Sequence, residues 1–181
     1  MNIYSLLATV ASCIYLTLGL YILVLDKKSP IHRLFFYMCF TLFIFSCCAI
    51  FGYSAENDRI LIFWLKLTLI AALIHYPTAL HFCFKISKIT KLNNKLFFFT
   101  LYLPSLLFIL REIIDKSSTI FLFIKINNYW EFVVKNDIWA FLIFSTSYLY
   151  LLICLIILFL WGIKAKTKKK KNNQKFYCIH Y

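Results

Sequence analysis

The chain has 181 residues, of which 62% are hydrophobic, 20% aromatic and 15% charged, and its mean hydropathy is +0.79. A soluble domain would be about half apolar and about a quarter charged, so this composition excludes a soluble globular protein. Three Gly and three Pro also exclude collagen-like and low-complexity disordered chains. An integral membrane protein is the class that remains.

Several apolar runs are long enough to cross a bilayer as helices, since a spanning helix needs about 20 residues. A barrel strand would have about ten residues and would alternate polar with apolar side chains, which these runs do not do. The sequence therefore predicts an all-α membrane protein, a bundle of about five transmembrane helices. The predicted spans are residues 3–25, 34–55, 60–84, 96–114 and 138–163. We expect a membrane domain over residues 1–163 and a basic cytoplasmic tail over residues 164–181.

The fourth span depends on the placement of two charged residues. Its uninterrupted apolar run covers residues 96–110 and reaches residue 114 only if Arg111 and Glu112 lie at the membrane interface. With that placement no acidic side chain lies inside an apolar span. A proton relay across the membrane is therefore not expected.

The net charge of +13 follows from how lysines and arginines are distributed between the loops. Fourteen of the twenty fall on one side of the predicted membrane and five on the other, and Lys66 lies within a span. Because cytoplasmic loops carry the excess of Lys and Arg, we expect the N-terminus outside and the tail inside, in a bacterial inner membrane. The charge thus indicates topology and not a nucleic-acid partner. Each lysine of a basic strip in the tail should add about 1 kcal/mol of attraction to anionic lipid. The strip is Lys168, Lys169, Lys170 and Lys171.

Three ionisable side chains inside the third predicted span are candidates for ligand sensing, because burying such groups in a membrane is costly. Lys66 either extends to the headgroups or binds an anionic ligand or a partner acid. His75 is either a neutral imidazole hydrogen-bonded to a neighbouring helix or a group that responds to protons or ligand. His81 should be anchored near the cytoplasmic interface. Since His75 and His81 are six residues apart, they do not converge on one helix face, and no metal site is expected.

No catalytic motif or cofactor-binding motif is recognisable, and we expect neither enzyme activity nor a cofactor. The seven cysteines include no Cys-x-x-Cys pair, so reduced thiols that pack as small hydrophobes are expected. In the first span small residues recur at helical spacing, which predicts a packing face within the bundle. They are Ser5, Ala8, Thr9, Ser12 and Gly19.

The long loop after the fourth span is rich in aromatic and β-branched residues, which favour strands. Residues 119–126 and 129–135 are predicted to form a two-stranded hairpin over the outer mouth of the bundle, with Asn127 and Asn128 at the turn. The hairpin is either a docked structural loop or a lid over a ligand.

Four segments resemble the N-terminal seven-helix sensor region of bacterial membrane histidine kinases, which also precedes cyclase domains. They are SPIHRLF at residues 29–35, FWLKL at 63–67, LHFCF at 80–84 and the basic loop KKKKNNQK at 168–175.

The resemblance implies an input module of a signalling receptor, with a histidine kinase or a cyclase as its output partner and the lipid bilayer around it. Two further helices and an output domain would follow in that family, so we expect a truncated form, which ends where a sixth helix would begin. A remnant without function is one alternative. Another is a small membrane scaffold or a lipid- or solute-binding subunit of a membrane complex.

Overall fold

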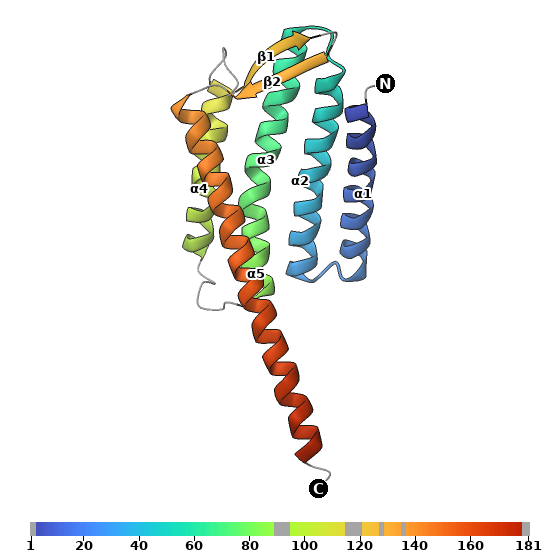
Figure 1. Cartoon of the computed structure of the whole chain (residues 1–181), viewed down its shortest axis with the longest axis vertical. Coiled ribbons are helices and arrows are strands. Elements are labelled where there is room, and N and C mark those ends of the chain that lie inside the picture. Colours follow the sequence, from blue (N-terminus) through green and yellow to red (C-terminus); the bar gives the residue numbers. More distant parts are fainter. Residues whose placement is uncertain (1–2, 89–94, 115–120, 127–128, 135–136, 179–181) are drawn as a thin grey trace.

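A computed structural model of the chain describes residues 3–88, 95–114, 121–126, 129–134 and 137–178. Within these residues five helices are long and apolar enough to cross a membrane, which confirms the predicted helical bundle. The helices are α1 (Ile3–Leu25), α2 (Pro30–Tyr53), α3 (Asp58–Ile86), α4 (Lys95–Ile114) and α5 (Ile138–Cys178) (Figure 1).

Helix α3 is the centre of the bundle. It packs against α2 on one side and against α4 and α5 on the other, whereas α1 packs against α2 (Figure 1). Two apolar cores follow from this arrangement. Leu69 and Leu73 of α3 belong to the first, and Leu80 and Cys83 of the same helix belong to the second. Because α3 contributes to both cores, a shift of α3 changes the packing of its neighbours.

Helix caps explain why two helices begin before their apolar runs. The predicted second span begins at residue 34, but α2 begins at Pro30, where the missing proline N–H costs nothing in the first turn. The Ser29 hydroxyl accepts a hydrogen bond from the His32 N–H at 3.5 Å. Likewise, the Asn57 side chain accepts from the Ile60 N–H at 3.0 Å and starts α3 at Asp58.

Small residues bring α1 close to α2, as predicted for the packing face. Ser5, Ser12 and Gly19 are buried. A Cβ added at Gly19 would lie 2.8 Å from the Cβ of Cys39, so only glycine permits this approach. The prediction is wrong for Thr9, which is exposed and donates its hydroxyl hydrogen to the Ser5 carbonyl oxygen of its own helix at 2.7 Å.

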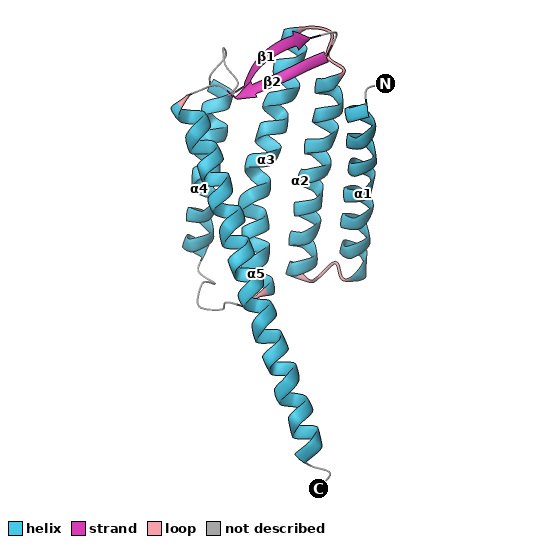
Figure 2. Cartoon of the chain, viewed as in Figure 1, coloured by secondary structure: helices cyan, strands magenta, loops and turns pink. Residues whose placement is uncertain are grey.

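Two six-residue strands, β1 (Phe121–Ile126) and β2 (Tyr129–Val134), lie between α4 and α5 in the chain. They pair antiparallel, from Phe121 opposite Val134 to Ile126 opposite Tyr129 (Figure 2). The predicted turn at residues 127–128 lies outside the described residues. The strands and the start of α1 lie at the same end of the bundle, called here the hairpin end (Figure 1).

Helix α5 runs for 41 residues and continues well past the predicted end of its span at residue 163. Its apolar part covers Ile138–Lys164. The part from residue 165 to residue 178, called here the tail segment, projects beyond the other helices at the end opposite the strands (Figure 1). The helix continues because no Gly or Pro follows Gly162 in the described residues, and because lysine and glutamine are good helix formers.

Candidate functional site

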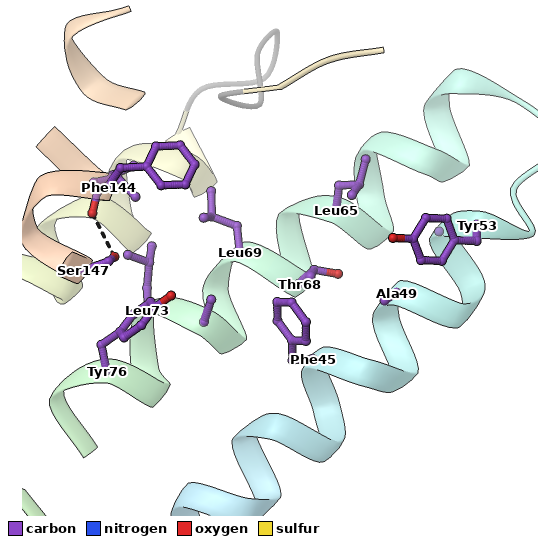
Figure 3. A pocket seen from close by; sticks show the side chains of 13 residues that line it. Phe45, Ala49, Tyr53, Leu65, Thr68, Leu69, Leu73, Tyr76, Phe144 and Ser147 are labelled. Carbon is purple, nitrogen blue, oxygen red and sulfur yellow. Dashed lines mark hydrogen bonds between the residues drawn. The ribbon is translucent and has the colours of Figure 1, made fainter. Parts of the chain in front are cut away.

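An apolar cavity of about 360 Å³ lies between α2, α3 and α5 (Figure 3). Its walls include the aromatic rings of Phe45, Tyr76 and Phe144, and small residues such as Ala49 and Ala72 leave the space open. The lining residues all belong to parts of these helices that can span a membrane. The cavity extends from Tyr76 of α3 to Tyr53, the last residue of α2.

Hydroxyl groups supply the polar atoms of the cavity wall. Thr68 donates its hydroxyl hydrogen to the Trp64 carbonyl oxygen at 2.9 Å, and Ser147 donates its own to the Ile143 carbonyl oxygen at 2.8 Å (Figure 3). A hydroxyl has one hydrogen and two lone pairs. Both oxygens therefore retain a lone pair that can accept a hydrogen bond from within the cavity.

Lys66 of α3 reaches across to α4. Its Nζ donates a hydrogen bond to the main-chain carbonyl oxygen of Glu112 at 3.1 Å. The lysine is half-buried in this position, so its contact is with a neighbouring helix and not with headgroups alone. A role of Lys66 in sensing stays a prediction.

His75 lies in the middle of α3 and contacts α2. Its Nδ1 is 3.1 Å from the Thr41 hydroxyl oxygen, and that hydroxyl also donates to the Met38 carbonyl oxygen at 2.8 Å. The Thr41 hydroxyl has a single hydrogen, so it can donate to Met38 only while Nδ1 of His75 supplies the hydrogen between the two side chains. The contact agrees with the interpretation of His75 as an interhelical hydrogen-bonding group and leaves a response to protons or ligand untested.

His81 packs against α4 nearer to the tail segment. Its ring stacks on Phe98 with centroids 3.9 Å apart, and its Nδ1 is 3.3 Å from the Tyr102 hydroxyl oxygen. The Nζ of Lys85 lies 5.2 Å from the centroid of the same Phe98 ring. His81 thus joins α3 to α4 through an aromatic cluster.

The three predicted residues lie at different levels of α3 and do not form one site. None of them is among the described residues that line the cavity. In the described ranges no group of three or more His, Cys, Asp or Glu side chains could hold a metal ion. Each predicted residue instead contacts one neighbouring helix.

Charged side chains gather at the hairpin end, where α4 ends and α5 begins. Glu112 has no exposed surface, and its Oε1 is 2.6 Å from Nη1 of Arg111. Nη2 of Arg111 lies 3.8 Å from Oδ2 of Asp137, and its guanidinium lies 5.3 Å from the centroid of the Trp139 ring. Together with Lys66, this charge cluster joins α3, α4 and the start of α5.

Comparison with known protein families matches residues 6–177 to the family described as the N-terminal 7TM region of histidine kinase. The chain belongs to this family. No curated protein and no solved structure matches the chain at a significant level. The match confirms the resemblance carried by the four loop and helix segments, and it extends over nearly the whole chain.

Family and fold together establish the class of protein. The chain matches a sensory region of histidine kinases, and its described residues form five helices that can cross a membrane. It is therefore a multi-pass membrane protein of the sensory type.

Sequence reasoning missed two features of this sensor region. The sequence placed Glu112 near the end of the fourth span but did not indicate that its side chain is fully buried against neighbouring helices. The neighbouring Arg111 pairs with its carboxylate, whereas Lys66 of α3 and Asp137 before α5 join the cluster from distant positions in the chain, which a linear pattern does not show. The cavity was missed because it depends on how α2, α3 and α5 are placed. Hydroxyl residues within the apolar spans, such as Thr68 and Ser147, are a sequence signal that could have indicated it.

Proposed function

We propose that this chain is the membrane-embedded input module of a histidine-kinase-type receptor and acts on a kinase or cyclase output domain. The family match over residues 6–177 is the observation that carries the proposal. The five apolar helices supply the membrane-embedded structure that such a module requires. The module itself is not expected to catalyse a reaction.

In this proposal α5 transmits the signal. It begins beside the charge cluster at the hairpin end and continues as one helix to Cys178. A helix transmits rotation and translation along its axis because its backbone hydrogen bonds are internal. Movement of α3 against α5 would therefore change the position of the tail segment.

We further propose that Lys66, His75 and His81 contribute to sensing by fixing α3 against its neighbours. Their contacts with Glu112, Thr41 and Tyr102 support this role. Polar contacts between helices within a bilayer contribute about 0.6 kcal/mol on average, which is small enough for a stimulus to shift them.

The proposed orientation has the hairpin end outside and the tail segment in the cytoplasm of a bacterial cell, with the inner membrane as the site. The excess of Lys and Arg on the tail side supports it. Lys168, Lys169, Lys170 and Lys171 lie on the helical backbone of the tail segment, where they would attract anionic lipid headgroups. The strands β1 and β2 would then cover the outer end of the bundle.

Fusion reporters test this orientation. Green fluorescent protein joined after Tyr181 should fluoresce, whereas alkaline phosphatase joined at the same place should be inactive, because each reporter folds on one side of the membrane only. Active phosphatase together with a dark fluorescent protein would overturn the orientation.

A kinase fusion tests the function itself. A histidine-kinase catalytic core is joined after Tyr181 of the full chain and, for comparison, after a fragment that contains α5 alone (residues 137–181). The input module should change autophosphorylation by at least about fivefold relative to α5 alone, which is the lower range of allosteric coupling. Equal autophosphorylation by the two fusions would contradict the proposed function.

A further inference from the structure

The cavity between α2, α3 and α5 is suited to a ligand without net charge. None of the described residues that line it is Lys, Arg, His, Asp or Glu. An ion placed there would lose its hydration without gaining a partner, which is strongly unfavourable. Carboxylates, phosphates and amines in their charged forms are therefore poor ligands for this cavity.

Four residues that line the cavity carry hydroxyl groups, and two of them, Thr68 and Ser147, offer acceptors for a ligand that donates a hydrogen bond. Tyr53 and Tyr76 carry the others. The hydroxyl hydrogens of Thr68 and Ser147 are directed to carbonyl oxygens of their own helices, at 2.9 Å and 2.8 Å. Their oxygens therefore offer lone pairs to the cavity, and a ligand O–H satisfies such an acceptor. A ligand that has only acceptor atoms, such as an ether, gains nothing from either oxygen.

The size and the walls of the cavity suit a small apolar molecule. Its volume of about 360 Å³ falls within the range of ligand pockets in proteins. Phe45 and Phe144 offer ring faces against which an aromatic ligand can stack (Figure 3). Ala72 contributes to the lining without filling the space.

We infer that this cavity binds a neutral lipophilic phenol or alcohol that arrives from the bilayer and donates a hydrogen bond to Thr68 or Ser147. The inference rests on the proposed function only in treating such a molecule as the stimulus of the sensor. Bound there, the molecule contacts α2, α3 and α5 together. It would thereby link the central helix to the helix that carries the tail segment.

A matched pair of ligands tests the inference on the full chain in phosphatidylcholine vesicles. The probe is an alkylphenol whose alkyl chain carries a diazirine and an alkyne, and its crosslinks are mapped by mass spectrometry to α2, α3 and α5. The competitors are 4-hexylphenol and its methyl ether 4-hexylanisole, compared at equal mole fractions in the bilayer. The phenol should displace the probe at about fivefold lower mole fraction, since one hydrogen bond distinguishes the two. Equal competition would show that the cavity accepts any apolar chain and would overturn the inference.

Three variants locate the site. The double variant Thr68→Val with Ser147→Ala keeps the apolar walls and should remove the preference for the phenol. Ala72→Phe fills the cavity and should abolish crosslinking, whereas the control Ile74→Phe adds a ring to an exposed position of the same helix and should leave crosslinking unchanged.

A preference that persists in the double variant, or crosslinking that persists in Ala72→Phe, would overturn the inference. Should Ala72→Phe fail to fold, the double variant alone decides it. No kinase takes part in this assay, so its failure would concern the ligand, while failure of the kinase fusions would concern the proposed function.

Discussion

Glu112 is a carboxylate with no exposed surface at the end of a membrane-spanning helix. Arg111 lies 2.6 Å from it, and the Nζ of Lys66 lies 3.1 Å from its main-chain oxygen. A buried carboxylate is tolerated only where cations and hydrogen bonds replace its hydration. The charge cluster is therefore expected to stabilise the hairpin end as a unit.

Removal of Arg111 tests this expectation. Arg111→Met should lower the free energy of unfolding by about 3–5 kcal/mol, because it removes the guanidinium beside a buried carboxylate. Arg33→Met is the control, since Arg33 is exposed and its loss should cost within about 0.5 kcal/mol. Both values are measured by reversible unfolding in mixed micelles. Similar losses for the two variants would contradict the role of the cluster.

Gly19 allows the close approach of α1 to α2, and its replacement tests this contact. Gly19→Ala places a methyl group 2.8 Å from Cys39 Cβ, which forces α1 away from α2 and should cost about 1–3 kcal/mol. Gly162→Ala is the matched control, because a Cβ at Gly162 meets nothing within 4 Å. Thermal unfolding in detergent should therefore show a lowered midpoint for Gly19→Ala alone. An equal shift of both midpoints would refute a close α1–α2 contact.

Between elements, the Thr41–His75 hydrogen bond should hold α2 against α3. A double-mutant cycle with Thr41→Val and His75→Phe isolates their interaction, which we expect to be about 0.6 kcal/mol and at most about 1.7 kcal/mol. The free energy of unfolding of the four proteins gives the coupling. Additive losses, with no coupling, would mean that the contact does not contribute to stability.

His75 is also the candidate for a response of the sensor to pH. If His75 responds to protons, the wild-type fusion to a kinase core should change autophosphorylation between pH 6 and 8, because histidine ordinarily titrates near pH 6.5. His75→Ala should remove that change. A pH response that survives His75→Ala would exclude His75 as its origin.

The elements themselves were largely predictable from the sequence, and their ends were less so. Hydropathy gave the order of five helices because lipid requires about 20 apolar residues per span. It placed the end of the last span at residue 163, next to the end of the apolar part of α5 at Lys164, whereas the helix itself continues to Cys178. Hydropathy detects where the lipid ends, whereas a helix ends where its backbone hydrogen bonds end. The caps at Ser29 and Asn57 show the same difference at the beginning of α2 and α3.

At the scale of the whole molecule, the sequence could not predict which helices are neighbours. Small residues indicated a packing face on α1, but nothing in the runs indicated that α3 would contact α2, α4 and α5. The cavity and the burial of Glu112 both depend on that arrangement. Candidate residues could therefore be chosen by type, as Lys66, His75 and His81 were, but not grouped into a site.

A continuous α5 that transmits the state of the bundle is the central element of the proposed function. The most direct test inserts alanines after Lys164 in the full chain joined to a histidine-kinase core. Two added residues turn the following helix by about 200°, whereas seven add about two full turns. We predict that autophosphorylation changes strongly with the two-residue insertion and returns close to the parent value with the seven-residue insertion. Equal autophosphorylation with zero, two and seven added residues would contradict signal transmission through α5.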